Sequence, residues 1–241
     1  MRGTKKKLAA ILTAVAVMGL TLMGCGQELT PADQNVNALL ELSAKNNPKP
    51  MMDLLGYETE EDVYNAFFED GIAAAEDDSA IVDELIATLA GTGMEIPEDE
   101  IQEFSDAMTD LVNKVTYTTE ITSEDKDLVV VTVKVNGISE EELEQVMADA
   151  IVTMTEGLSN LTDDEIMLIQ SGDMSPATPY MQQYLKDVIA GVKAMEPMAE
   201  ANEFTVNCEK LAVEVGDKEK IAWLPQDMNQ FERKVEAALY Q

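Results

Sequence analysis

The stretch Lys114–Asn136, KVTYTTEITSEDKDLVVVTVKVN, decides the fold class, because its apolar residues alternate along the chain instead of recurring at helical spacing. In 114–122, the odd-numbered residues from Val115 to Ile121 face one side, and in 127–136 the odd-numbered residues from Val129 to Val135 are all Val. β-Branched residues favour strands, and the polar residues 123–126 provide a turn. The pattern predicts a β-hairpin with one buried face.

A second hairpin is predicted near the C-terminus. Apolar residues alternate over 204–208 and again over 211–215, but on the opposite parity, so a β-bulge is expected at Glu209–Lys210. Gly216–Asp217 predicts the turn. The partner strand contains residues 221–224 and ends at Pro225.

The rest of the mature chain predicts helices, because apolar residues recur there at intervals of three and four. Most of these helices begin at a capping residue or near a proline. They cover 35–45, ended by 46–50, and 176–196, and others begin at Thr59, Ser79, Pro97, Ser139, Thr162 and Asp227. Four methionines on the helix stripes are expected to fill the core, namely Met147, Met154, Met181 and Met195.

Helices and hairpins in this order indicate an α+β fold. We expect one antiparallel sheet of two hairpins, about four strands in all, packed with helices. Residues 34–241 show no internal repeat and predict a single α+β domain.

The N-terminus, MRGTKKKLAAILTAVAVMGLTLMGC, has the pattern of an export signal. A basic start precedes an apolar run from Leu8 to Met23, which is shorter than the ~20 residues that span a bilayer. This predicts a secretory signal helix. An ordinary signal with an incidental Cys, or an uncleaved anchor helix, remains as the alternative.

Leu22-Met23-Gly24-Cys25 resembles the lipobox of bacterial lipoproteins. The resemblance implies that residues 1–24 are a lipoprotein signal peptide and that cleavage falls between Gly24 and Cys25. It implies that Cys25 is acylated (palmitate is the type of chain expected), with 25–33 as a short tether. The protein is then held to the outer face of the cell membrane through the lipid on Cys25.

The mature chain also resembles uncharacterised Gram-positive lipoproteins of a domain-of-unknown-function group with a cystatin-like or NTF2-like fold. The matching strings are 55–61, 115–118, the Val-rich 128–135 and the late strand with Trp223 before a final helix. The resemblance implies a sheet wrapped by helices. It carries over no functional residue.

Charge and composition exclude several function classes. The chain has 16 Lys and Arg, 47 Asp and Glu and no His. The first 24 residues hold four of the basic residues and no acid, so the mature chain has 12 basic and 47 acidic residues, a formal charge of −35. Such a surface repels nucleic acid, and the absence of His excludes Ser-His-Asp catalysis and His-ligated zinc. Cys208 alternates with apolar residues and is expected to be a buried, inert thiol.

Acidic clusters are the remaining candidates for chemistry, since paired carboxyls can act as general acid and base. They are residues 60–62, 76–78, 98–100, 140–142 and 163–165. Most fall in the first turn of a predicted helix, where the helix dipole favours acids, so we predict no catalytic residue, no metal site and no cofactor.

Aromatic residues give the one candidate binding site. Tyr64, Phe67 and Phe68 on one predicted helix, with Tyr180 and Tyr184 on another, could line a cleft, or be buried between layers. The sequence therefore predicts a lipid-anchored, non-enzymatic binding or interaction protein, with a small molecule, a peptide or another envelope protein as ligand. The alternatives are a carboxylate-dependent envelope hydrolase and a passive surface spacer.

Overall fold

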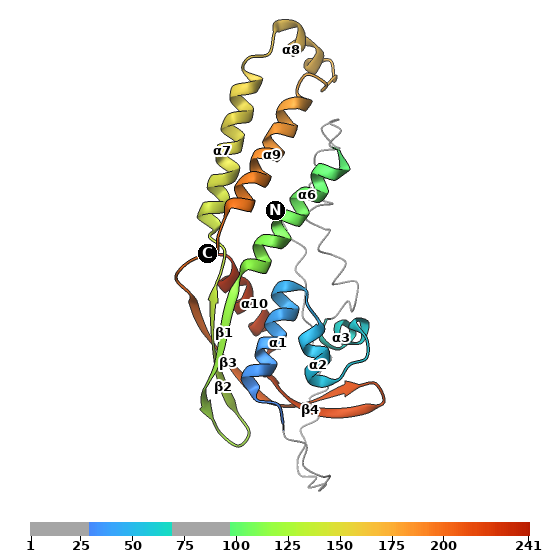
Figure 1. The fold of residues 1–241 in the computed structure, drawn as a ribbon, viewed down its shortest axis with the longest axis vertical. Coiled ribbons are helices and arrows are strands. Elements are labelled where there is room, and N and C mark those ends of the chain that lie inside the picture. The colour runs from blue at the N-terminus through green and yellow to red at the C-terminus, as the bar shows by residue number, and fades with distance from the viewer. Residues whose placement is uncertain (1–28, 69–96) are drawn as a thin grey trace.

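The computed structural model describes residues 29–68 and 97–241, so the signal helix, Cys25 and the helix predicted from Ser79 lie outside the described residues. The described part is an α+β fold with one four-stranded sheet, ordered β1-β2-β3-β4, in which every neighbouring pair is antiparallel (Figure 1). The strands are β1 Thr116–Glu124, β2 Val129–Asn136, β3 Asn202–Val215 and β4 Lys218–Pro225. The predicted α+β class and the two hairpins are confirmed.

The first hairpin buries the face that its sequence indicated. The four odd-numbered Val of β2 are at most 1% exposed. The turn lies slightly later than predicted, since the Asp125 N–H donates to the Leu128 carbonyl at 2.8 Å. A register shift between Ile121 and Ser123 marks a bulge that the sequence pattern did not predict.

The long strand β3 corrects the second prediction. Its residues 202–208 pair with β2 and 208–215 pair with β4, both in uniform register, so the bulge expected at Glu209–Lys210 is wrong. The buried parity changes because different elements cover the two halves. Lys234 of the last helix donates to the Thr205 carbonyl at 2.8 Å. Lys220, opposite Val213, donates to the carbonyl of Leu55, which follows α1 in the chain, at 2.6 Å.

Helices α1 Ala32–Lys45 and α10 Met228–Leu239 pack on the sheet and on each other. The predicted break at 46–50 ends α1, but it also begins an unpredicted helix, α2 Lys49–Leu55. Pro50 lies in the first turn of α2. Backbone N–H groups in a first turn have no partner within the helix, so the missing N–H of proline costs no hydrogen bond there. Helix α3 Glu60–Phe67 follows, capped as predicted by Thr59, whose hydroxyl accepts the Asp62 N–H at 3.2 Å.

The core lies between the sheet and these helices. Its largest fully buried side chains come from α1, α3, α10 and neighbouring elements: Leu39, Leu40, Leu42, Met51, Phe67, Leu111, Ile138, Met195, Leu224 and Phe231. Gly137 lies against the carbonyl oxygens of Ala238 and Leu239, which leaves no space for a Cβ. This contact fixes the C-terminus to the segment that leaves the sheet.

The other helices are α6 Glu98–Lys114, α7 Glu140–Leu158, α8 Asp163–Gln170 and α9 Thr178–Ala194. Residues 140–194, with α7 and α9 side by side and α8 at the far end, project from the sheet and are called the arm here (Figure 1). Close packing of α7 on α9 uses two glycines, Gly191 against Val146 and Gly157 against the Tyr180 ring. Among the described helices, none is long and apolar enough to cross a bilayer.

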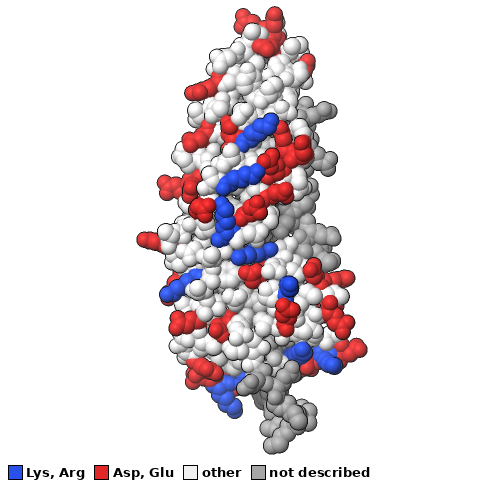
Figure 2. Space-filling view, viewed as in Figure 1, with Lys and Arg blue, Asp and Glu red and all other residues white. Residues whose placement is uncertain are grey.

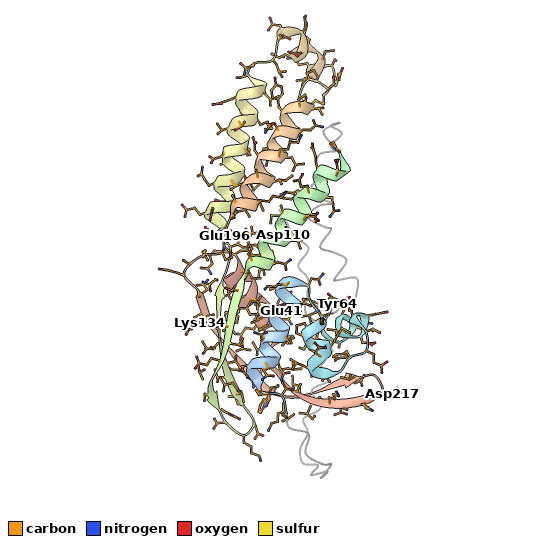
Figure 3. All side chains as sticks on the ribbon, in the orientation of Figure 1. Glu41, Tyr64, Asp110, Lys134, Glu196 and Asp217 are labelled. Carbon is orange, nitrogen blue, oxygen red and sulfur yellow. The ribbon has the colours of Figure 1, made fainter. Side chains whose placement is uncertain are left out.

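Ion pairs join α6 to the second half of α9 and to Glu196 just beyond it. They are Glu100 with Lys186 at 3.1 Å, Glu103 with Lys193 at 2.6 Å, and Lys114 with Glu196 at 3.0 Å, the last near the labelled Glu196 in Figure 3. Basic and acidic side chains accordingly lie next to one another across the middle of the molecule in Figure 2. Since most of these groups are exposed, the pairs orient the arm more than they stabilise it.

Candidate functional site

The predicted cleft residues occupy two separate places. Tyr64, Phe67 and Phe68 are buried beside the sheet, and the Tyr64 hydroxyl lies 2.8 Å from the Asn46 side-chain oxygen. Tyr180 and Tyr184 lie on α9 in the arm and are half-buried, and burial raises the pKa of Tyr184. Figure 1 shows α3 well apart from α9, so the two groups are not brought together. A cleft formed by either group stays a prediction.

Two surface hollows are formed by other residues. A shallow groove of about 350 Å³ lies between α1, α2 and β1, and its lining residues are Gln34, Asn37, Ala38, Pro50, Asp53, Leu54 and Thr119. A notch of about 70 Å³ lies beside α10, where Phe231 and Lys234 form part of its wall. Neither hollow contains a residue of the predicted aromatic set.

The acidic clusters lie where helix starts place them. Residues 60–62, 140–142 and 163–165 occupy the first turns of α3, α7 and α8, and 98–100 begin α6. The cluster 76–78 lies outside the described residues. Among the described residues, no three acidic or Cys side chains are grouped as metal ligands would be. The acids thus mark four separate helix starts rather than one site.

Cys208 lies fully buried in β3, where burial raises the pKa of its thiol to about 12. A thiol with so high a pKa carries no thiolate at neutral pH, so it is a poor nucleophile. This agrees with the predicted inert, buried Cys.

The most distinctive surface feature is apolar and lies on the arm. Six large apolar side chains of α7 and α8 are at least 40% exposed: Met147, Ile151, Val152, Ile166, Met167 and Leu168. We call this set the arm surface. Isolated exposed apolar residues are normal, but a gathering of them marks an interaction site.

The arm surface corrects part of the sequence prediction. Met195 is 1% exposed and fills the core as expected, but Met147 is 41% exposed. Helix α9 packs on the Val146 side of α7 and leaves the Met147–Ile151 side uncovered. The sequence carried a signal for this exposure, because the apolar residues of 140–158 form a stripe that is wider than one partner helix can cover.

The charge around the arm surface has one sign. Residues 135–185 contain ten Asp and Glu and no Lys or Arg. In the view of Figure 2 the far end of the arm accordingly shows acidic and uncharged residues, and the basic residues lie lower, toward α6 and the sheet. The arm surface is therefore apolar with an acidic surround.

Comparison with known proteins gives no family for this chain. No family model and no curated protein matches it. One solved structure, of a "putative lipoprotein (ycdA)" from Bacillus subtilis subsp. subtilis str. 168, superimposes with a TM-score of 0.48 at 13% sequence identity. The match covers 87% of this chain and 56% of that one, so this chain spans little more than half of its neighbour's length. At this level of likeness, the neighbour assigns no function to this chain.

Proposed function

We propose that this chain is an exported, lipid-anchored, non-enzymatic interaction protein that presents its arm to a partner. Acylation of Cys25 after cleavage behind Gly24 would hold it on the outer face of the membrane, and acyl anchoring of this kind needs no spanning helix. The proposal includes a relation to the cystatin-like or NTF2-like lipoproteins that the sequence resembles.

The observation that carries the proposal is the arm surface. Exposing six large apolar side chains to water is unfavourable by roughly 25 cal/mol per Å² of apolar area. A partner that covers them recovers this free energy. A passive spacer would gain nothing from such a surface, and a hydrolase would need carboxyls that face each other rather than the separate helix starts described above.

The direction of the arm supports the anchoring. Helix α1 begins at the opposite end of the molecule from α8 (Figure 1), and Leu29, the first described residue, precedes it by three positions in the chain. A lipid on Cys25, only four residues earlier, would hold that end near the membrane, because the stretched chain reaches ~3.3–3.6 Å per residue. The arm would then point away from the membrane toward a partner.

Photocrosslinking in living cells tests the interaction. A photoreactive residue replaces Met167 on the arm surface, and the matched control replaces Asp217, which is exposed in the β3–β4 turn (Figure 3). We expect a discrete crosslinked protein from position 167 and not from position 217. Crosslinks at neither position, or equally at both, would contradict the proposal and favour the spacer.

Substitution of Cys25 tests the anchor. Cys25→Ala should leave the signal uncleaved and remove the acyl mass from the chain, measured by fractionation and intact-mass spectrometry. Cys208→Ala, which removes the buried thiol, is the control and should remain acylated. A Cys25→Ala chain that is cleaved and still membrane-bound would overturn the anchor.

A further inference from the structure

We infer that the arm surface binds an amphipathic, Lys- or Arg-bearing helix of another protein. This inference rests on the proposed function and adds the class of the partner. It is carried by two properties of residues 140–174, namely the uncovered apolar side chains and the absence of any positive charge.

Helix α8 exposes apolar side chains. This eight-residue helix has no buried residue, although its sequence, DDEIMLIQ, holds four large apolar residues. A helix this short is marginal in water by itself, and most helical stability comes from packing an apolar face. Ile166, Met167 and Leu168 are 40–58% exposed, and because they are consecutive they point in different directions around the helix. The described part of the chain therefore leaves most of the apolar surface of α8 without a cover.

Helix α7 also exposes apolar side chains. Val146 lies against Gly191 of α9 and Ala150 is buried, whereas Met147 and Ile151, each one position further along the helix, are 41% and 46% exposed. Residues four apart lie on one face, so these two form a stripe along α7. Exposed apolar residues on such a stripe can pack against the i, i+3, i+4, i+7 face of an amphipathic partner helix, as apolar grooves do.

The charges around the arm surface indicate the class of partner. Glu144, Glu156 and Asp164 are exposed on α7 and α8, and no Lys or Arg occurs between 135 and 185. The first lysine beyond, Lys186 at the middle of α9, pairs with Glu100 of α6. Complementary charge at the rim of an interface steers association and suppresses wrong partners, so the complement of this rim is basic.

The same charges disfavour the other occupants. A second copy would place the same acidic rim against itself in a two-fold contact, and like charges across an interface cost free energy. An anionic membrane surface would repel the rim for the same reason. Both occupants are kept as outcomes of the test.

The test uses the full acylated chain in nanodiscs of zwitterionic lipid, with empty nanodiscs as background. The probe is a fluorescein-labelled helical peptide of about five turns, or about 18 residues, with Leu on one face and Lys on the other. Two further peptides replace every Lys by Glu or by Gln. Fluorescence anisotropy gives Kd for each, at about 0.05 M and about 0.5 M salt, where screening differs strongly.

Two triple variants compare the effect on peptide binding of removing charge from the arm and from the β3–β4 hairpin. The arm variant carries Glu144→Gln, Glu156→Gln and Asp164→Asn, and the control carries Glu214→Gln, Asp217→Asn and Glu219→Gln, which removes as much charge from the exposed β3–β4 hairpin. Three exposed pairs at roughly 0.5 kcal/mol each make the expected loss in the arm variant about tenfold in Kd, against less than about twofold in the control. An Ile151→Gln/Met167→Gln variant, checked for folding by circular dichroism, should lose binding altogether.

The outcomes separate the inference from the proposed function. Tight, salt-sensitive and arm-dependent binding of the Lys peptide alone supports the inference. Equal binding of the Lys and Glu peptides, or no binding while position 167 still crosslinks to a protein in cells, overturns it and leaves the proposed function standing. Sedimentation of a wild-type dimer that the Gln double variant abolishes, or arm-dependent binding to anionic vesicles, overturns it in favour of self-association or a lipid surface.

Discussion

The carboxylate of one residue, Glu41, joins helix α1 to strand β1 and to the loop before α2. Glu41 near the end of α1 accepts hydrogen bonds from the hydroxyl of Tyr117 on β1 and from the Asn47 side chain, the latter at 2.8 Å (Figure 3). Lys45 lies 3.5 Å from the same carboxylate and 5.0 Å from the centre of the Tyr117 ring. Glu41 is half-buried, so its partners replace much of the water that an exposed carboxylate would have.

Tyr117→Phe should therefore destabilise the protein. The substitution removes a hydrogen bond to a charged group, which is worth about 1.5–3 kcal/mol, and Lys45 and Asn47 remain to hold Glu41. We expect a loss of about 1.5 kcal/mol in the free energy of unfolding, measured by urea denaturation. An unchanged urea midpoint would show that this contact contributes nothing.

Tyr57→Phe should have the opposite effect. The Tyr57 ring packs edge-on against Phe67 with centroids 6.3 Å apart, but its buried hydroxyl has no hydrogen-bond partner among the described residues. Burial, with the nearby Asp62 charge, raises the pKa of Tyr57 to about 12. Since a buried unpaired hydroxyl costs about 1–3 kcal/mol, its removal should leave the urea midpoint unchanged or raise it. A clear loss of stability would mean that the hydroxyl is paired after all.

At the scale of elements, the best local prediction was the start of α8. The Thr162 hydroxyl accepts the Glu165 N–H at 3.4 Å, and the Glu165 carboxylate accepts the Thr162 N–H at 2.8 Å, which forms a capping box at the start predicted at Thr162. These bonds lower the pKa of Glu165 below its ordinary value of 4.5. A box of this kind uses two residues three apart, so it can be found in a sequence without knowledge of the fold.

The start of α8 should fray in acid. Because the pKa of Glu165 is lowered by folding, its stabilising contribution is present above pH 4.5 and is lost as the pH falls through the lowered value. Amide hydrogen exchange over 162–166 should therefore accelerate, relative to the intrinsic rate, below that pH. Glu165→Gln keeps a capping side chain but does not titrate, so the protection of the same amides in this variant should not change with pH. If their exchange accelerates equally in this variant, another group causes the effect.

Two elements show why local pattern was insufficient. The sequence placed a bulge in β3 because the buried parity changed at 209–210, but the strand changes partners there and keeps its register. Helix α2 was missed because Pro48 and Pro50 indicate a break, and the same prolines suit the first turn of a new helix. Both errors come from a local signal with two physical causes that only neighbouring elements distinguish.

The whole molecule is unevenly stabilised. The four odd-numbered Val of β2 are at most 1% exposed, whereas α8 buries no residue. Between these extremes, α9 buries four residues and α7 buries Ala150. Local opening follows burial, because elements with few buried contacts open at low free-energy cost.

Hydrogen exchange should therefore follow a gradient along the arm. We expect the amides of β2 to exchange slowest, those of α9 at intermediate rates and those of α8 fastest, measured by mass spectrometry on peptic fragments at neutral pH. Uniform protection from the sheet to α8 would contradict the gradient. It would mean that the arm surface is covered in solution, for example by a second copy.

The sequence by itself determined the α+β class, both hairpins, most helix starts and the acidity of the arm. Each of these depends on spacing between residues close in the chain, such as the alternating Val of β2 or the Thr162–Glu165 box. The tertiary structure decided which faces are covered. It buried Tyr64 and Phe67, left Met147 and Met167 exposed and separated the aromatic groups. Exposure depends on which distant elements pack together, because an apolar stripe on a helix has the same sequence whether or not a partner covers it.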